Sequence, residues 1–106
     1  MSMDMNKMLQ QVQQMQADML KAQEELANER VEASVGGGMV TVTASGAGEI
    51  VDVKISPEAI DPDDPETLQD LVLAGVNQAL KNAQDLAQSK LGDVSGGLKG
   101  LGLPGL

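Results

Sequence analysis

An apolar residue recurs at alternating steps of three and four positions through the first quarter of the chain. The members of this repeat are Met5, Met8, Val12, Met15, Met19, Ala22 and Leu26. A mean step of 3.5 residues predicts a narrow apolar seam along one side of a long helix. Continued from about Met3 to Glu29, this helix is about 40 Å long, whereas a compact domain of this size has a radius of gyration of about 13 Å. We therefore expect the seam to lie against a second copy of the chain or to project as an arm.

The composition limits both the core and the chemistry. The 106 residues fit one domain, and the 42% hydrophobic content includes no Phe, Tyr or Trp. Because aromatic side chains usually fill small cores, we expect a partner subunit to complete this one. The absence of Cys and His removes disulfides, thiolate nucleophiles, the usual zinc sites and every His-based triad.

The chain carries a formal net charge of −9. Such a chain is repelled by nucleic-acid phosphates and anionic lipid and favours basic partners, although the charge also serves solubility. The longest apolar run is too short for a membrane span, and no secretion signal is evident. We expect a cytoplasmic protein with no membrane partner.

After the helix, the hydrophobic period changes to two. Three short β-branched runs at residues 30–35, 39–45 and 49–55 are separated by Gly36–Gly38 and by Gly46–Gly48. Alternating apolar residues between glycine-rich turns predict an antiparallel meander with one apolar face.

A second helix is predicted over residues 64–91. Asp64 is its expected N-cap and Pro65 its first helical residue. Its apolar stripe is expected to cover the sheet, with Leu71, Val72, Val76 and Ala79 packed on Val42, Val51 and Val53. Leu73 lies outside that stripe and therefore points to contact with a second subunit.

The predicted fold class is therefore α+β in a single dimerising domain, residues 1–91. It comprises a helical arm at 1–30, the sheet at 31–55 and the second helix at 64–91. Residues 92–106 are rich in Gly and Leu and are expected to form a flexible tail.

No active site can be assembled from the sequence. The acidic run Asp61–Glu66 lacks the Gly and the bidentate Glu of a calcium loop, and an acidic helix start explains it better. The Ser and Thr residues lack an activating base. We expect no enzyme activity, no metal, no cofactor and no small-molecule substrate.

The seven basic residues include three on the predicted arm, Lys7, Lys21 and Arg30. Lys7 and Lys21 are two heptads apart and share a helix face, about 21 Å from each other. In a two-fold dimer these cations could contact phosphates of duplex nucleic acid, because the chain has no aromatic platform for single strands. The alternative is that they only solubilise the helix.

The chain resembles the YbaB/EbfC family of bacterial nucleoid-associated proteins over nearly its whole length. The resemblance rests on the Met/Gln-rich first helix ending in Lys21–Leu26, on the stretch Leu68–Ala79 around Asn77, and on the ending Leu103–Leu106. It implies a tweezer-like homodimer that binds double-stranded DNA with little sequence preference. Effects on nucleoid organisation, gene expression and DNA protection are also implied.

From the seam, the excess apolar surface and the resemblance, we predict a homodimer interface formed by Met5, Met8, Val12, Met15, Met19, Leu73 and Asn77. Lys7, Lys21 and Arg30 are the candidate DNA contacts. The alternative function is an acidic dimeric adaptor that binds another protein through its arms or its C-terminal tail.

Overall fold

The computed structural model describes the backbone of residues 2–99 and the side chains of residues 4–92. The elements follow in the order α1 (Ser2–Asn28), β1 (Arg30–Val35), β2 (Val40–Ser45), β3 (Ile50–Ile55), the short 3₁₀ helix η1 (Pro57–Ala59) and α2 (Pro65–Lys99). The two helices and the three-stranded antiparallel sheet confirm the α+β prediction.

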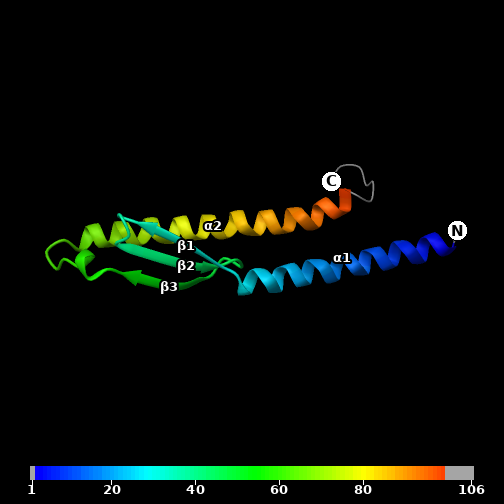
Figure 1. The fold of residues 1–106 in the computed structure, drawn as a ribbon, viewed down its shortest axis with the longest axis horizontal. Helices are drawn as coiled ribbons and strands as arrows, with labels where there is room; N and C mark the ends of the chain where they lie inside the picture. The colour runs from blue at the N-terminus through cyan, green and yellow to red at the C-terminus, as the bar shows by residue number, and fades with distance from the viewer. Residues whose placement is uncertain (1, 100–106) are drawn as a thin grey trace.

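The molecule is long and narrow. Its principal extents are 75 × 23 × 16 Å and its radius of gyration is 20.4 Å, well above the roughly 13 Å expected for a compact chain of this length. Figure 1 shows the cause: the sheet and the first half of α2 form a body at one end, and α1 projects from it as an arm beside the second half of α2. The N-terminal end of α1 and the C-terminal end of α2 therefore lie at the same end of the molecule.

The sheet has the order β1-β2-β3, and both pairings are antiparallel. Val35 pairs with Val40 across a turn in which Gly36, Gly37 and Gly38 all have positive φ, a conformation that side chains with a Cβ rarely adopt. The register between β2 and β3 shifts at Thr43 and Ala44. The glycine-rich segments are therefore hairpin turns, as their sequence predicts.

Helix α2 begins as predicted. The Asp64 carboxylate accepts hydrogen bonds from the Thr67 backbone N–H at 3.3 Å and from the Thr67 hydroxyl at 2.6 Å, which is N-cap geometry. The helix continues to Lys99, beyond the expected end at residue 91. The part of the expected flexible tail that the structure describes is thus helical, and residues 100–106 of that tail lie outside the described residues.

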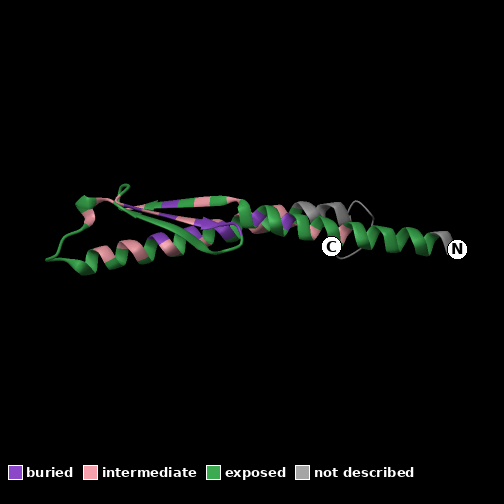
Figure 2. Cartoon of the chain, turned by 90° about the horizontal axis from the view of Figure 1, so that it is seen from below, coloured by how far each residue is buried: buried purple, intermediate pink, exposed green. Residues whose placement is uncertain are grey.

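The core lies between α2 and the first two strands (Figure 2). Its buried members are Ala33, Val40, Val42, Ala44, Ala79 and Ala83, with Leu71, Val72 and Val76 packed against them. The predicted packing of these α2 residues on Val42 is confirmed. The predicted packing on Val51 and Val53 is wrong, because α2 lies over β1 and β2 and every residue of β3 is exposed.

Gly75 explains why α2 comes so close to the sheet. A Cβ built on Gly75 would lie 2.8 Å from Val42 Cγ2, in a contact too short for a real side chain. Val42 is fully buried and cannot move away without disturbing the centre of β2. The helix backbone therefore rests directly on the strand at this position.

Gly75→Ala is expected to push α2 away from β2 and to destabilise the fold by about 1–3 kcal/mol, the usual cost of overpacking. The midpoint and slope of urea unfolding measure the destabilisation. Gly92→Ala is the matched control, because Gly92 is also helical and its added Cβ meets nothing within 4 Å. It should leave stability unchanged or raise it by up to about 1 kcal/mol; equal effects of the two substitutions would contradict the packing argument.

Candidate nucleic-acid interface

Charge is distributed unevenly along the molecule. Six carboxylates and no Lys or Arg occur between Glu58 and Asp70, in η1, the following turn and the start of α2. This acidic end (residues 58–70) lies at the end of the molecule opposite the arm (Figure 1). By contrast, residues 1–21 carry two Lys and two Asp, so that the rest of the chain holds the whole net charge of −9.

Part of the acidic end has a local structural role. The Asp61 side chain accepts a hydrogen bond from the Asp63 backbone N–H at 2.9 Å, and Asp64 caps α2. These carboxylates shape the turn and complement the positive end of the helix dipole. Within the described part of the chain, no group of three or more Asp or Glu could hold a metal ion.

The two lysines of α1 are available to a partner. Lys7 and Lys21 are both exposed, and their separation of fourteen residues places them on one face of the straight helix, about 21 Å apart. That face is turned about 130° away from the midline of the Met seam, because each lysine falls two positions after a seam residue. α1 thus has an apolar side and a separate basic side.

Arg30, the third predicted contact, has a different position. It begins β1, and its Nη1 donates hydrogen bonds to the carbonyl oxygens of Ala27 at 2.9 Å and Glu29 at 3.1 Å. The guanidinium therefore binds carbonyl groups at the C-terminal end of α1, where positive charge is favoured. Arg30 thus stabilises the C-terminal end of α1 at the base of the arm, and its role as a DNA contact stays a prediction.

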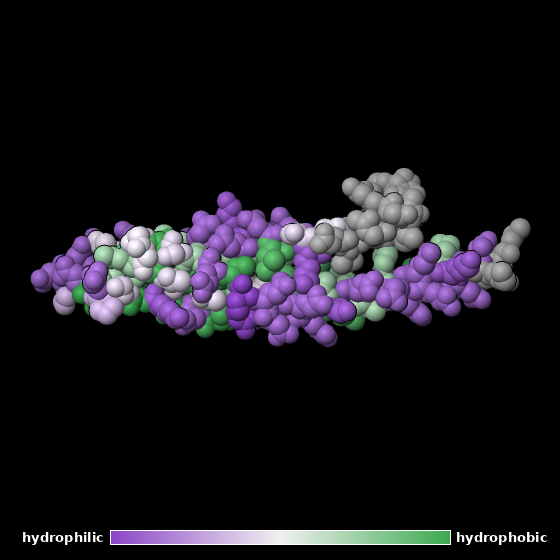
Figure 3. All heavy atoms as spheres, in the orientation of Figure 1, coloured by the Kyte–Doolittle hydropathy of each residue, from purple (hydrophilic) through white to green (hydrophobic). Residues whose placement is uncertain are grey.

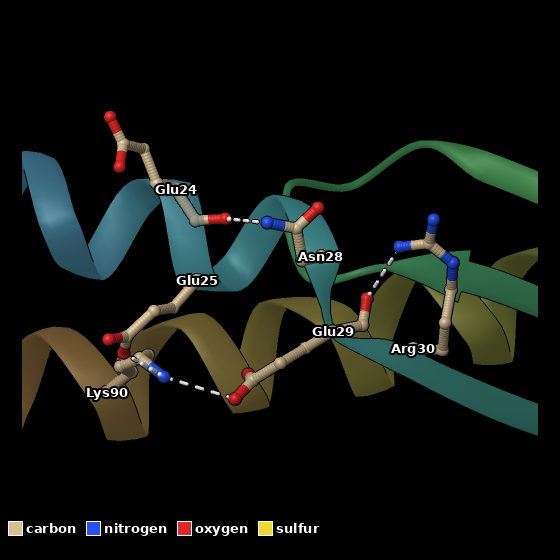
Figure 4. A network of polar contacts seen from close by, with 6 residues as sticks. All are labelled: Glu24, Glu25, Asn28, Glu29, Arg30 and Lys90. Carbon is tan, nitrogen blue, oxygen red and sulfur yellow. Dashed lines mark hydrogen bonds and ion pairs between the residues drawn. The ribbon is translucent and has the colours of Figure 1, made fainter.

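Lys90 joins the two helices at the same place (Figure 4). Its ammonium group lies 2.8 Å from Glu25 Oε2 and 3.1 Å from Glu29 Oε1, and its side chain is 23% exposed. The hydrogen bond from Lys90 lowers the pKa of Glu25 below its ordinary 4.5. The hydrogen bonds to Glu25 and then to Glu29 raise the pKa of Lys90 above its ordinary 10.5.

Backbone contacts secure this base further. A Cβ on Gly46 would lie 2.5 Å from the Leu26 carbonyl oxygen, and the Gly46 N–H donates to the Glu29 carbonyl at 3.1 Å. Leu26 and Ala22 are buried beside this contact. The arm therefore leaves the body from a fixed joint made of the last turns of α1, the β2–β3 turn and Lys90 of α2.

Exposure of the seam increases steadily from this joint toward the tip. Leu26 is 4% exposed, Met15 and Met19 are half-buried, and Met8 is 64% exposed. The expectation that the seam is poorly covered within one subunit is thus confirmed for Met5, Met8 and Val12. Whether this seam contacts a second copy stays a prediction.

A second apolar surface lies on the body, between α2 and β3. Because α2 leaves β3 uncovered, a groove with apolar walls forms there, lined by Ile55, Leu68, Gln69, Val72, Leu73 and Val76. Figure 3 shows a patch of apolar side chains near the middle of the molecule, between polar regions. Leu73 is 60% exposed and Asn77, one helical turn further on, is also exposed. The predicted interface residues therefore belong to two separate surfaces, one on the arm and one on the body.

Sequence reasoning did not assign the other cations. Lys54 lies on β3 and Lys81 on α2, both exposed. Their places on the surface follow from the position of α2 on the sheet, which the hydrophobic pattern does not specify. Lys90 could be found only by its partners, because it pairs with residues more than sixty positions earlier.

Residues 1–98 match the family model described as the YbaB/EbfC DNA-binding family. A nucleoid-associated protein of Pelotomaculum thermopropionicum is 54% identical over 97% of this chain and 95% of its own length. One from Rhodococcus opacus is 50% identical over 97% of this chain and 91% of its own. These names point to a non-enzymatic role. In addition, no helix among residues 2–99 has an apolar stretch long enough to cross a membrane.

The fold also occurs in a solved structure. The crystal structure of the uncharacterized protein HP0035 from Helicobacter pylori superposes with a TM-score of 0.72 and covers 83% of this chain and 92% of that one. At 22% sequence identity, this likeness shows the shared fold alone.

Lys90→Met is expected to loosen the joint at the base of α1, because it removes the charge and keeps much of the aliphatic stem. Backbone amides of residues 22–29 should exchange with deuterium faster than in the unsubstituted protein. The exposed Lys81→Met on the same helix is the control and should leave this exchange unchanged.

The same pair gives a pH test. Because the pKa of Glu25 is lower in the folded chain, its contribution to stability is present above its ordinary pKa and is lost as pH falls through the lowered one. The difference in urea midpoint between the unsubstituted protein and Lys90→Met should therefore be present at neutral pH and shrink below pH 4.5. A difference that persists unchanged in acid would contradict this role.

Proposed function

Because the chain belongs to the YbaB/EbfC DNA-binding family, we propose that it is a non-catalytic nucleoid-associated protein that binds duplex DNA as a homodimer with little sequence preference. The observation that carries this proposal is the position of Lys7 and Lys21. They are exposed on the arm, within residues 1–21, which carry no net charge, and both lie away from the acidic end at residues 58–70.

This separation allows an acidic protein to approach a polyanion. Interactions between exposed charges are largely screened beyond about 8 Å at physiological ionic strength, and the molecule is 75 Å long. The phosphates of a duplex against the outer face of the arm would therefore be attracted strongly by Lys7 and Lys21. They would be repelled only weakly by the carboxylates of the acidic end. Two lysines per chain give few phosphate contacts, so binding should be weak, with a salt dependence that reflects this small number of contacts.

The chemistry of the arm favours backbone contacts. Lysines hold phosphates as point charges and carry little sequence information. The outer face also carries several Gln residues, which can donate hydrogen bonds to phosphates. Because the chain has no aromatic side chain on which bases could stack, duplex DNA is the better ligand than a single strand.

The groove on the body supports the homodimer. β3 is an edge strand that pairs on one side only, and its apolar residues Ile50, Val51, Val53 and Ile55 are all exposed. An apolar edge strand beside an apolar groove is usually covered in a native assembly. We place a second copy there, contacting Leu73 and Asn77, so that each dimer carries two arms and four arm lysines. Such a dimer could hold two segments of DNA and so affect nucleoid organisation, gene expression and DNA protection.

Replacing Lys7 and Lys21 together by Gln is expected to weaken binding to a random-sequence duplex. Fluorescence anisotropy over a range of salt concentrations measures the affinity. The slope of log affinity against log salt should become shallower by about 0.9 for each phosphate that the variant no longer neutralises. The matched control replaces Lys54 and Lys81 by Gln, which removes the same charge from β3 and α2; equally weak binding by both variants would place the DNA elsewhere.

Leu73→Asp is expected to separate the dimer, because a carboxylate would be buried without a partner in the interface. Light scattering coupled to size exclusion gives the mass. Leu20→Asp is the control, since Leu20 is exposed to nearly the same extent, 61%, but lies on α1. If the mass of Leu73→Asp equals that of the control, the groove is not the dimer interface.

A further inference from the structure

The arm presents an apolar surface that neither the core nor the groove accounts for. Its seam is buried at Leu26 and open at Met8 and Met5, so the outer turns of α1 have no cover among the described residues. A long helix with such a seam is normally covered by another helix. Methionines suit this purpose because their unbranched side chains adapt to an irregular partner surface.

Electrostatics favours a second copy of the arm as that other helix. With two Lys and two Asp, residues 1–21 of two copies approach each other without net repulsion. Residues 22–106, which carry the whole net charge of −9, repel the same residues of a second copy. Contact between these outer parts of two arms therefore carries no penalty from net charge.

The distribution of charge also favours one relative orientation of the two α1 helices. Parallel arms would bring two acidic bodies side by side at one end of the pair. Antiparallel arms place the bodies at opposite ends, farther apart than the distance over which salt screens their charges. The seam also fits this arrangement, because the alternating steps of three and four allow Met8 to face Met19 and Val12 to face Met15 of the second copy.

We propose that the Met-rich seam of α1 pairs antiparallel with the same seam of a second copy, as a self-association contact separate from the groove. Lys7 and Lys21 lie about 130° from the midline of the seam and so remain free on the outside of the pair. The inference goes beyond the proposed DNA binding and does not require it.

Two separate self-association contacts on one chain have a consequence for assembly. A two-fold contact at the groove leaves both arms of a dimer free, and each arm can then pair with an arm of another dimer. Because the two contacts lie at different places on the molecule, one dimer cannot satisfy both of them by itself. Dimers would therefore link to one another in linear assemblies. The arm contact spans only about four helical turns and is smaller than the roughly 1,600 Å² of a standard interface. Because so small a contact is weak, we expect the size of the assemblies to increase with protein concentration.

Mass measurements without DNA test this inference. Val12→Asp places a charge at the centre of the seam, and Leu20→Asp places the same charge on α1 away from the seam. We expect the mass of the unsubstituted protein and of Leu20→Asp to rise with concentration beyond that of the smallest species, and Val12→Asp to abolish the rise. An unchanged rise in Val12→Asp, or no rise in the unsubstituted protein, overturns the proposal.

Cysteine cross-linking keeps the test valid if Val12→Asp disturbs the helix. The chain has no Cys, so Met8→Cys and Met19→Cys each introduce a single thiol. In the antiparallel pair a mixture of the two variants should form a mixed disulfide on oxidation. Met8→Cys alone should not, because its two thiol positions lie about 16 Å apart along the axis. Efficient cross-linking of Met8→Cys alone, or none in the mixture, overturns the antiparallel pairing.

The two proposals fail separately. Loss of DNA binding in the Lys7 and Lys21 variant, with unchanged concentration dependence of mass, leaves the seam contact standing. Loss of that concentration dependence in Val12→Asp, with DNA binding retained by the smaller species, identifies the seam as a protein contact.

Discussion

The direct contact between the backbone of α2 and the centre of β2 decides what the rest of the molecule exposes. Gly75 lets the helix rest on Val42, and this position centres α2 over β1 and β2. The width of one helix cannot also cover β3, so that a groove forms beside it. The core is then small and made mainly of Val and Ala, which is why large apolar residues remain on the surface.

Separation of charge along a 75 Å molecule resolves the conflict between an acidic chain and a DNA ligand. Net charge describes solubility and the repulsion of whole molecules, whereas the field at a contact depends on groups within about one Debye length. Residues 1–21 of the arm carry no net charge and expose Lys7 and Lys21, while the densest group of carboxylates, residues 58–70, lies at the opposite end. A net charge of −9 is thus compatible with phosphate contacts in one region and with repulsion in another.

Local patterns predicted local structure well. The Met seam, the period-two strands and the Asp64 cap each depend on residues a few positions apart, and the structure contains all three elements. The lateral position of α2 was predicted wrongly. Its apolar residues could pack on either β1 and β2 or β2 and β3, and only the close approach at Gly75 determines which strands the helix covers. At the candidate site, the exposure of Lys7 and Lys21 followed from helix periodicity. The roles of Arg30 and Lys90 did not, because each depends on where another segment ends or packs.

The joint at Lys90 also constrains the order in which the chain can acquire its structure. Glu29 and Lys90 are 61 positions apart, so the contact that fixes the base of the arm closes one of the longest loops in the molecule. Such non-local contacts form late, since the entropy of loop closure is lost before they contribute. During synthesis α1 is made before its anchor on α2, so the base of the seam at Ala22 and Leu26 stays exposed in the nascent chain until Lys90 has been added. The seam that we assign to self-association therefore exposes a longer apolar stretch in the nascent chain than in the folded one.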